Sequence, residues 1–253
     1  GGDMGSFEAG VLKSFTQYLP PEEVMYDVVT GVSVGAINSA PIAFHPIGKE
    51  SDAADWMINM WGKLKSSNIY NSWSFGIPEG LLFREGLWDN SEELRYLKKT
   101  FDTFEDRQVF RKINMGAVDF NTGEVYKFTE EVGFSEIAQA VTASSSMPFA
   151  FNHAHINGST YVDGGSVWNI DISGAIERCK EVVDSDEDII IDVIMCNSVS
   201  QNKVNDTQEY NTLQNYMRYK QISGFYGKMS DYYEIMRGYP NVNFRYLVKP
   251  EQA

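Results

Sequence analysis

The sequence predicts a three-layer α/β fold, in which a mostly parallel central sheet is covered by helices on both faces. Short apolar segments typical of strands alternate with segments whose apolar residues recur at helical spacing. A glycine-flanked serine, Ser33, falls between one such strand and the next helix, at the carboxyl end of the strand. With 253 residues and 43% hydrophobic content, the chain is long enough to bury one full core, so we expect a single domain over residues 1–253.

The first half of the chain alternates helices with one short strand. The strand is expected over residues 26–30, where an apolar run ends at Gly31. The helix after it consists of small and apolar residues, and the others have apolar residues at helical spacing. Helices are expected, in chain order, over residues 6–19, 34–44, 51–65 and 90–101.

Strands resume in the second half. The sequence Asn121-Thr122-Gly123 is typical of a turn, so we expect a hairpin that joins residues 113–120 to residues 124–128. Residues 189–196 are apolar enough for a buried strand. The remaining elements are a helix over residues 134–143, a helical stretch over residues 206–239 and a last strand over residues 242–248.

The charge balance excludes several classes of partner. The chain carries a formal net charge of −14, which argues against nucleic acid as a partner and against electrostatic docking to anionic membranes. Any membrane contact must therefore be mainly hydrophobic. No apolar run approaches the length of a transmembrane helix.

Cysteine and histidine usage gives no sign of a disulfide framework or a metal site. The two cysteines, Cys179 and Cys196, fall in a predicted helix and at the end of a predicted strand, which favours a reducing compartment. There is no CxxC sequence and no histidine-rich cluster. We therefore expect a cytoplasmic protein without a metal or another cofactor.

Ser33 is the first candidate for a catalytic residue. It lies in the run Thr30-Gly31-Val32-Ser33-Val34-Gly35-Ala36, which has the GxSxG pattern of a nucleophile elbow. Gly31 and Gly35 are expected to remove Cβ atoms that would collide as strand and helix close on each other. The helix that begins at Val34 would direct free N–H groups toward charge that develops beside Ser33. An ordinary glycine-rich turn is the alternative, because so short a motif also occurs by chance.

Two further glycine segments accompany this turn. Gly1, Gly2 and Asp3 precede a helix, and their N–H groups suit a phosphate cradle or an oxyanion hole. No Gly-Lys-Ser/Thr sequence follows, which argues against a nucleotide P-loop. Far downstream, Asp163 stands before Gly164 and Gly165. Asp-Gly is also common in surface turns, so this segment by itself does not indicate a site.

Together the three segments resemble the patatin-like phospholipase family, which has a glycine-rich oxyanion loop, a GxSxG elbow and a late Asp-Gly-Gly or Asp-Gly-Ala segment. The resemblance implies that Ser33 attacks an acyl ester and that Asp163 is its base, in a dyad without histidine. It also implies that Gly1, Gly2 and Asp3 hold the oxyanion. The implied partner is a lipid or phospholipid substrate, reached through transient contact with a membrane surface, and no cofactor is implied.

The start of the chain departs from the family pattern. Met4 stands where the family has Arg or Lys, and Asp3 stands where a small residue is usual. The first glycine of the family loop and the strand before it are missing, so we expect a truncated N-terminus. Asp3 and Met4 leave open one alternative, a lipid-binding pseudoenzyme with an impaired loop. A separate alternative is an acyltransferase that uses the same serine with an acceptor other than water.

The histidines provide an independent check. A Ser-His-Asp hydrolase of the common α/β type has its histidine after the acid, and no histidine follows Asp163. His45, His153 and His155 are expected to be structural or solvated. The rival mechanism is a triad that uses His153 or His155 with an earlier acid such as Asp119.

Two aromatic-rich segments are candidates for contact with lipid. Residues 70–88 combine aromatics with Gly76, Pro78 and Gly80, which suggests an irregular lid or rim. Residues 206–239 are rich in Tyr and Met. For this second segment core packing is favoured, because Tyr and Met at helical spacing more often fill cores than bind ligands.

Overall fold

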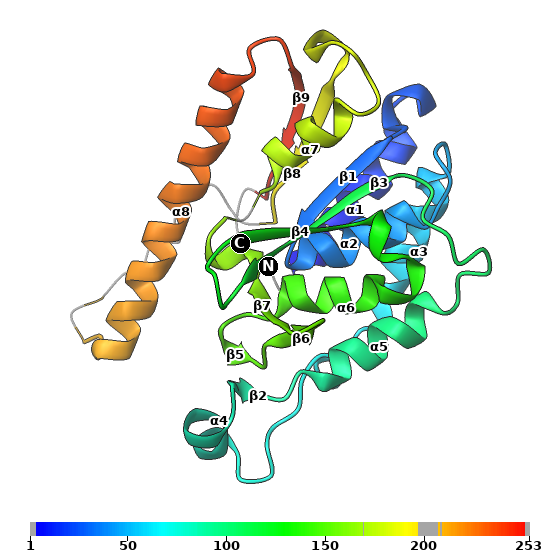
Figure 1. Cartoon of the computed structure of the whole chain (residues 1–253). Helices are drawn as coiled ribbons and strands as arrows, with labels where there is room; N and C mark the ends of the chain where they lie inside the picture. The colour runs from blue at the N-terminus through cyan, green and yellow to red at the C-terminus, as the bar shows by residue number, and fades with distance from the viewer. Residues whose placement is uncertain (1–3, 169, 197–206, 208, 251–253) are drawn as a thin grey trace.

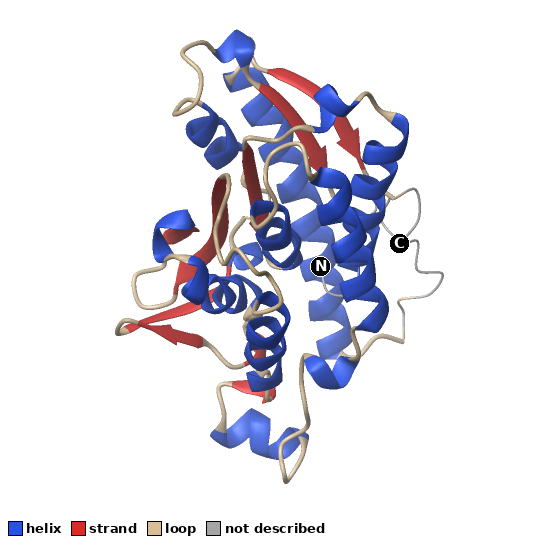
Figure 2. Ribbon diagram, turned by 90° about the vertical axis from the view of Figure 1, so that its right-hand side faces the viewer, coloured by secondary structure: helices blue, strands red, loops and turns tan. Residues whose placement is uncertain are grey.

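The computed structural model describes residues 4–168, 170–196, 207 and 209–250. Helices and strands alternate along much of the described chain, and helices pack around the strands (Figures 1 and 2). The predicted α/β class is confirmed.

The largest sheet has five strands and is built around β3 (Lys112–Asp119). The order across it is β1 (Val28–Val32), β3, β7 (Ser159–Asp163) and β6 (Ala154–Ile156), and β4 (Val125–Thr129) also pairs with β3. β1 and β3 are parallel, whereas β3–β4, β3–β7 and β6–β7 are antiparallel. The hairpin expected around Asn121 is confirmed as β3–β4.

Two smaller sheets complete the strand pairing of the described residues. β2 (Gly86–Trp88) pairs in parallel with β5 (Phe149–Phe151), and β8 (Ile190–Ile194) pairs in parallel with β9 (Asn243–Val248). Across the described residues, parallel and antiparallel pairs are equally frequent. The strand arrangement is therefore mixed, because the β3–β4 hairpin and the β6–β7 pair bring antiparallel neighbours into the largest sheet.

The predicted helices are confirmed, with ends that differ from expectation by a few residues. The strand expected over residues 26–30 instead begins at Val28 and continues through Gly31 to Val32, because these residues remain paired with β3. The helices are α1 (Gly5–Tyr18), α2 (Val34–Ala43), α3 (Glu50–Lys63), α4 (Ile77–Phe83), α5 (Ser91–Phe101), α6 (Phe134–Ser145), α7 (Ile172–Cys179) and α8 (Thr212–Gly238).

The two faces of β3 pack against different helices. Ile113 and Met115 are fully buried in a core that contains residues of α2 and α6. Asn114 lies between them in sequence and so points to the other face, where its Nδ2 donates to Asp171 Oδ2 at 3.2 Å, just before α7. Helices therefore cover both faces of the sheet at β3.

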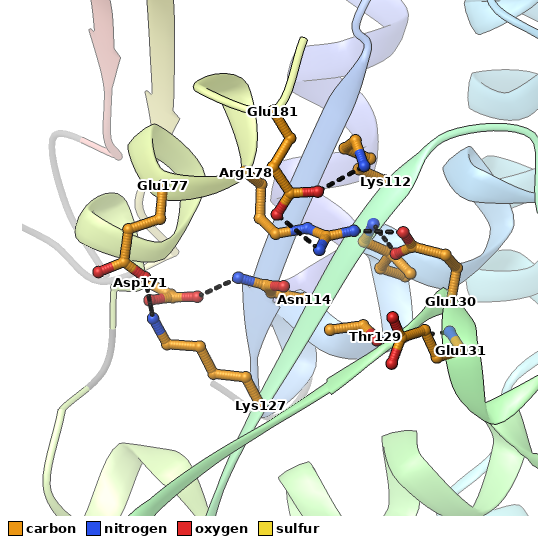
Figure 3. Close-up of polar contacts among 11 residues, drawn as sticks. Lys112, Asn114, Lys127, Thr129, Glu130, Glu131, Asp171, Glu177, Arg178 and Glu181 are labelled. Atoms are coloured by element: carbon orange, nitrogen blue, oxygen red, sulfur yellow. Dashed lines mark hydrogen bonds and ion pairs between the residues drawn. The ribbon is translucent and has the colours of Figure 1, made fainter.

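Ion pairs fasten α7 to the sheet (Figure 3). Lys127 Nζ on β4 lies 3.1 Å from Glu177 Oε2 and 3.5 Å from Asp171 Oδ1. At the far end of α7, Arg178 pairs with Glu130, which follows β4. Asp171 also caps α7, because its Oδ1 accepts the N–H of Gly174 at 3.1 Å. These contacts hold α7 over β3 and β4.

The strands and the helix expected near the C-terminus are present, but the packing of α8 differs from expectation. Tyr232 of α8 is buried with residues of β8 and β9 in a second core, but the favoured core packing is wrong for much of α8. Its tyrosines at 216, 219, 226 and 233 are 51–66% exposed, because α8 stands at the margin of the molecule (Figure 1). Over the part of the chain that the structure describes, no helix is both long enough and apolar enough to cross a membrane.

Candidate active site

Ser33 occupies a sharp turn between β1 and α2. β1 ends at Val32 and α2 begins at Val34, so Ser33 is the single connecting residue. Its backbone has φ 57° and ψ −122°, a conformation that a non-glycine residue rarely adopts. Such strain persists only where the surrounding structure holds it, and it clusters at functional sites.

Only one of the two flanking glycines is required for close packing. A Cβ on Gly31 would lie 2.1 Å from the carbonyl oxygen of Gly35, so any side chain there would force β1 and α2 apart. A Cβ on Gly35 would meet no atom within 4 Å. The expectation that a side chain at position 35 would collide with the strand is therefore wrong. Of the two glycines, only Gly31 is needed for the close approach of β1 and α2.

Asp163 lies directly beside Ser33, although 130 positions separate them in sequence. Ser33 Oγ donates a hydrogen bond to Asp163 Oδ2 at 2.7 Å. The pairing of β3 explains this contact, because Val32 is opposite Gly116 while Asp163 is opposite Ala117, the next residue of β3.

The carboxylate of Asp163 is held on its other side by the turn that follows it. Oδ1 accepts the N–H of Gly165 at 2.7 Å, and Asp163 as a whole is only 4% exposed. A Cβ on Gly164 would lie 2.6 Å from the carbonyl oxygen of Gly116, so this turn needs glycine to approach β3. Asp163 therefore presents one oxygen to Ser33 in a fixed orientation.

A run of buried serines at the C-terminal end of α6 supports both residues. The N–H of Ser33 donates to Ser144 Oγ at 2.9 Å, and Ser144 Oγ donates to the carbonyl oxygen of Gly116 at 2.5 Å. The N–H of Asp163 donates to the carbonyl oxygen of Ser146 at 2.9 Å. The sequence alone predicts no role for these serines. A polar run at the end of an otherwise apolar helix is the sequence signal that could have identified them.

The surroundings of Ser33 also include two helix N-termini. Val34 and Gly35 form the first turn of α2, where backbone N–H groups have no partner within the helix. A Cβ on Gly5, the first residue of α1, would lie 2.2 Å from Val34 Cγ2, so α1 begins next to this turn. The predicted oxyanion residues Gly1, Gly2 and Asp3 lie outside the described residues.

The histidines have partners elsewhere in the described structure. His45 Nδ1 lies 2.7 Å from the carbonyl oxygen of Pro41, and the ring of His153 lies 4.7 Å from that of Phe120, tilted by 54°. His155 contacts Thr160 Oγ1 and Glu85. These contacts agree with the expected structural or solvated roles.

A cavity of about 360 Å³ runs along β1 to Ser33. One wall is β1 and the other is β8, with α1, α2 and α7 around them. Most of its lining residues are apolar, including Val29, Ile42 and Val193, while Glu8 and Asn38 are among the polar groups. Asn38 Nδ2 donates to Glu8 Oε2 at 2.8 Å and to the carbonyl oxygen of Gly5 at 2.9 Å.

A second buried carboxyl group lies near Asp163. Glu93 on α5 is 1% exposed, and burial raises its pKa to about 7, with a further contribution from the negative charge of Asp163. The hydroxyl of Ser145 lies 2.5 Å from Glu93 Oε1 and 2.9 Å from the carbonyl oxygen of Val141. The hydroxyl of Ser145 has one proton, so it cannot donate to both oxygens at once. If Glu93 is protonated, its carboxyl group donates to Ser145 Oγ, and the hydroxyl of Ser145 donates to the carbonyl oxygen of Val141.

This arrangement predicts an unusual dependence of stability on pH. Burial raises the pKa of Glu93 in the folded protein to about 7. Between the ordinary glutamate pKa and pH of about 7, the folded protein therefore keeps a proton that the unfolded chain has released. The contribution of Glu93 is therefore fully favourable below pH of about 4.5 and is lost as pH rises to about 7, a change of about 3 kcal/mol in the free energy of unfolding. Glu93→Gln should remove this loss, so at pH 8 it should be more stable than wild type in urea unfolding.

The exposed Glu105 provides the control for this experiment. Glu105→Gln should follow the wild-type stability profile across the same pH range. A stability difference between Glu93→Gln and wild type that is independent of pH would contradict the protonated state of Glu93.

Cysteines and potential metal ligands form no centre in the described chain. Cys179 and Cys196 are both free thiols. Among the described residues, no group of three or more His, Cys, Asp or Glu side chains is placed to hold a metal ion.

Comparison with protein-family models identifies a family for this chain. The family model for patatin-like phospholipase matches residues 1–176, which include Ser33, Asp163 and the serines at the end of α6. No curated protein matches the chain.

Proposed function

Because this chain belongs to the patatin-like phospholipase family, whose members are typically lipid hydrolases, we propose that it is a lipid acyl hydrolase of the phospholipase A or esterase type. The observation that carries the proposal is the 2.7 Å hydrogen bond from Ser33 Oγ to Asp163 Oδ2, at a strained turn before a helix N-terminus. A nucleophile in hydrogen-bond contact with an oriented base is the arrangement that covalent acyl transfer requires.

In the proposed reaction, Asp163 accepts the proton of Ser33 while Oγ bonds to the ester carbonyl carbon. The tetrahedral intermediate collapses when its bond to the leaving oxygen breaks, and Asp163 returns the proton to that oxygen. Water then attacks the acyl-enzyme and gives its proton to Asp163. Breakage of the bond to Oγ releases a free fatty acid, and the proton returns to Ser33.

The oxyanion would be held by backbone N–H groups. The N–H of Ser33 already donates to Ser144, so we assign this role to the first turn of α2 and to the loop of Gly1, Gly2 and Asp3. Each donor of this kind is typically worth about 3 kcal/mol in the transition state. Backbone donors require no side chain, so Met4 in place of Arg or Lys does not remove them.

The cavity along β1 is the proposed site for the acyl chain. Its volume lies within the range of small-molecule sites, its lining is mainly apolar, and it reaches Ser33. A flexible apolar chain needs few polar partners, which matches this lining.

Fatty-acid release from vesicles of phospholipids and neutral lipids of different acyl lengths tests the proposal. We expect wild type to release acid from at least one lipid class and Ser33→Ala to release none above background. A fluorophosphonate probe should label wild type and not Ser33→Ala. Added alcohol or lysolipid acceptors distinguish hydrolysis from acyl transfer, because transfer would form a new ester in place of free acid.

Absence of both acid release and labelling in wild type would overturn the proposal. That result would support the lipid-binding pseudoenzyme, in which Asp3 and Met4 impair the loop.

A further inference from the structure

The segment around α4 projects from the body of the protein and exposes large apolar side chains. Figure 1 shows α4 at the edge of the molecule, away from the helices around the sheet. We call residues 73–84 the α4 protrusion. Its exposed apolar side chains are Phe75 (83% exposed), Ile77 (56%), Leu81 (60%), Leu82 (69%) and Phe83 (80%). So many exposed apolar side chains in one short segment indicate a contact surface.

The charged side chains of the α4 protrusion are bound to one another and to its own backbone. Glu79 accepts hydrogen bonds from the N–H of Phe75 at 3.0 Å and from Arg84 Nε at 2.8 Å. The guanidinium of Arg84 also lies 4.7 Å from the ring centre of Trp73, whose Nε1 donates to the carbonyl oxygen of Gly86 at 3.0 Å. These contacts neutralise the one acid and the one base of the protrusion and keep its shape.

The α4 protrusion is joined to the segment that supports the candidate active site. β2 follows it directly and pairs with β5, which begins at Phe149. Met147 and Phe149, immediately after the serines that contact Ser33 and Asp163, are themselves 48% and 59% exposed. The apolar surface therefore extends from α4 toward the chain segment that holds the nucleophile and its partner.

We propose that the α4 protrusion inserts into the surface of an uncharged lipid bilayer or lipid aggregate and so brings Ser33 to its substrate. The inference rests on the proposed function, because it assigns the surface at which that same site meets lipid. A lipid surface fits better than a protein partner, because protein interfaces carry a polar rim and regular hydrogen bonds, whereas this protrusion uses its charges internally. The net charge of −14 favours zwitterionic over anionic lipid.

The test measures binding apart from catalysis. The chain of residues 1–253 with Ser33→Ala is sedimented with phosphatidylcholine vesicles, and with vesicles that also contain phosphatidylserine. The test variant adds Leu81→Ser, Leu82→Ser and Phe83→Ser. The matched control adds Tyr216→Ser, Tyr219→Ser and Tyr233→Ser, which replace side chains of α8 that are also more than half exposed.

We expect the Ser33→Ala protein to bind phosphatidylcholine and the α4 variant to bind at least about tenfold more weakly, because three apolar side chains no longer leave water. The α8 control should bind as the parent does, and phosphatidylserine should weaken binding. Thermal unfolding should be unchanged in the α4 variant, since the replaced side chains are exposed.

Equal binding by the α4 variant and its parent, or no binding by the parent, would overturn the inference. A different result in lipid-free sedimentation would also overturn it: a dimer formed by the parent and by the α8 control but not by the α4 variant. The exposed surface would then join two copies of the chain. Vesicle binding without fatty-acid release from the protein that retains Ser33 would support the surface and refute the hydrolase. Fatty-acid release without vesicle binding would support the hydrolase and refute the lipid-binding surface.

Discussion

Replacement of Asp163 with asparagine is expected to lower kcat/KM for ester hydrolysis by about 10⁴-fold, as loss of the acid does in a serine triad. Asparagine has nearly the same shape, and its amide oxygen can still accept the N–H of Gly165. Its other side would carry an NH₂ group, which cannot accept the proton of Ser33 Oγ. Steady-state hydrolysis of a short-chain ester measures the effect without any dependence on vesicle binding.

Two sets of variants make this result specific. Ser33→Ala should lose about as much activity, and the double variant should lose little more than either single variant, because the two residues act as one unit. His153→Ala and His155→Ala should remain active. Loss of activity in a histidine variant, together with activity in Asp163→Asn, would contradict the dyad and favour the triad with Asp119.

Replacement of Arg111 with methionine is expected to lower the free energy of unfolding by about 3–5 kcal/mol. The side chains of Arg111 and Glu50 are 0% and 2% exposed, and Arg111 Nη1 lies 2.7 Å from Glu50 Oε1. Arg111 also donates to the carbonyl oxygens of Tyr26 and His45, so it ties the start of β1 to the end of α2 and to α3. Methionine leaves Glu50 as a buried carboxylate without its cation. Urea unfolding monitored by circular dichroism gives the change.

Two controls separate this effect from the general loss of a charged side chain. The double variant Arg111→Met/Glu50→Gln should recover part of the lost stability, because it removes the unpaired charge. Arg107→Met breaks an ion pair with Asp102 whose side chains are more than half exposed, so it should change stability by less than about 1 kcal/mol. An equal loss in Arg107→Met and Arg111→Met would show that burial of the pair has no role.

The sequence predicted those elements that depend on local pattern. The β3–β4 hairpin follows from two apolar runs around Asn121-Thr122-Gly123, and the amphipathic helices follow from apolar spacing over several turns. β2, β5 and β6 were not predicted, because three residues are too few to show a period of two. The helix α4 was also not predicted, because Gly76, Pro78 and Gly80 favour an irregular segment.

The position of Ser33 between a strand and a helix was determined by the sequence itself. Gly31 permits the close approach of β1 and α2, and the residues that form this turn are neighbours along the chain. The candidates Ser33 and Asp163 were likewise named from their motifs. Local sequence was sufficient in these cases because the interactions that shape a tight turn act within a few residues.

Other features were decided only by the tertiary structure. The contact between Ser33 and Asp163 depends on consecutive register positions of β3, to which their strands pair. The raised pKa of Glu93 depends on burial by α6 and on the charge of Asp163, and the exposure of α4 depends on the absence of a covering element among the described residues. Each of these properties arises between residues far apart in the chain, whose distances and solvent access are set only when strands pair and helices pack.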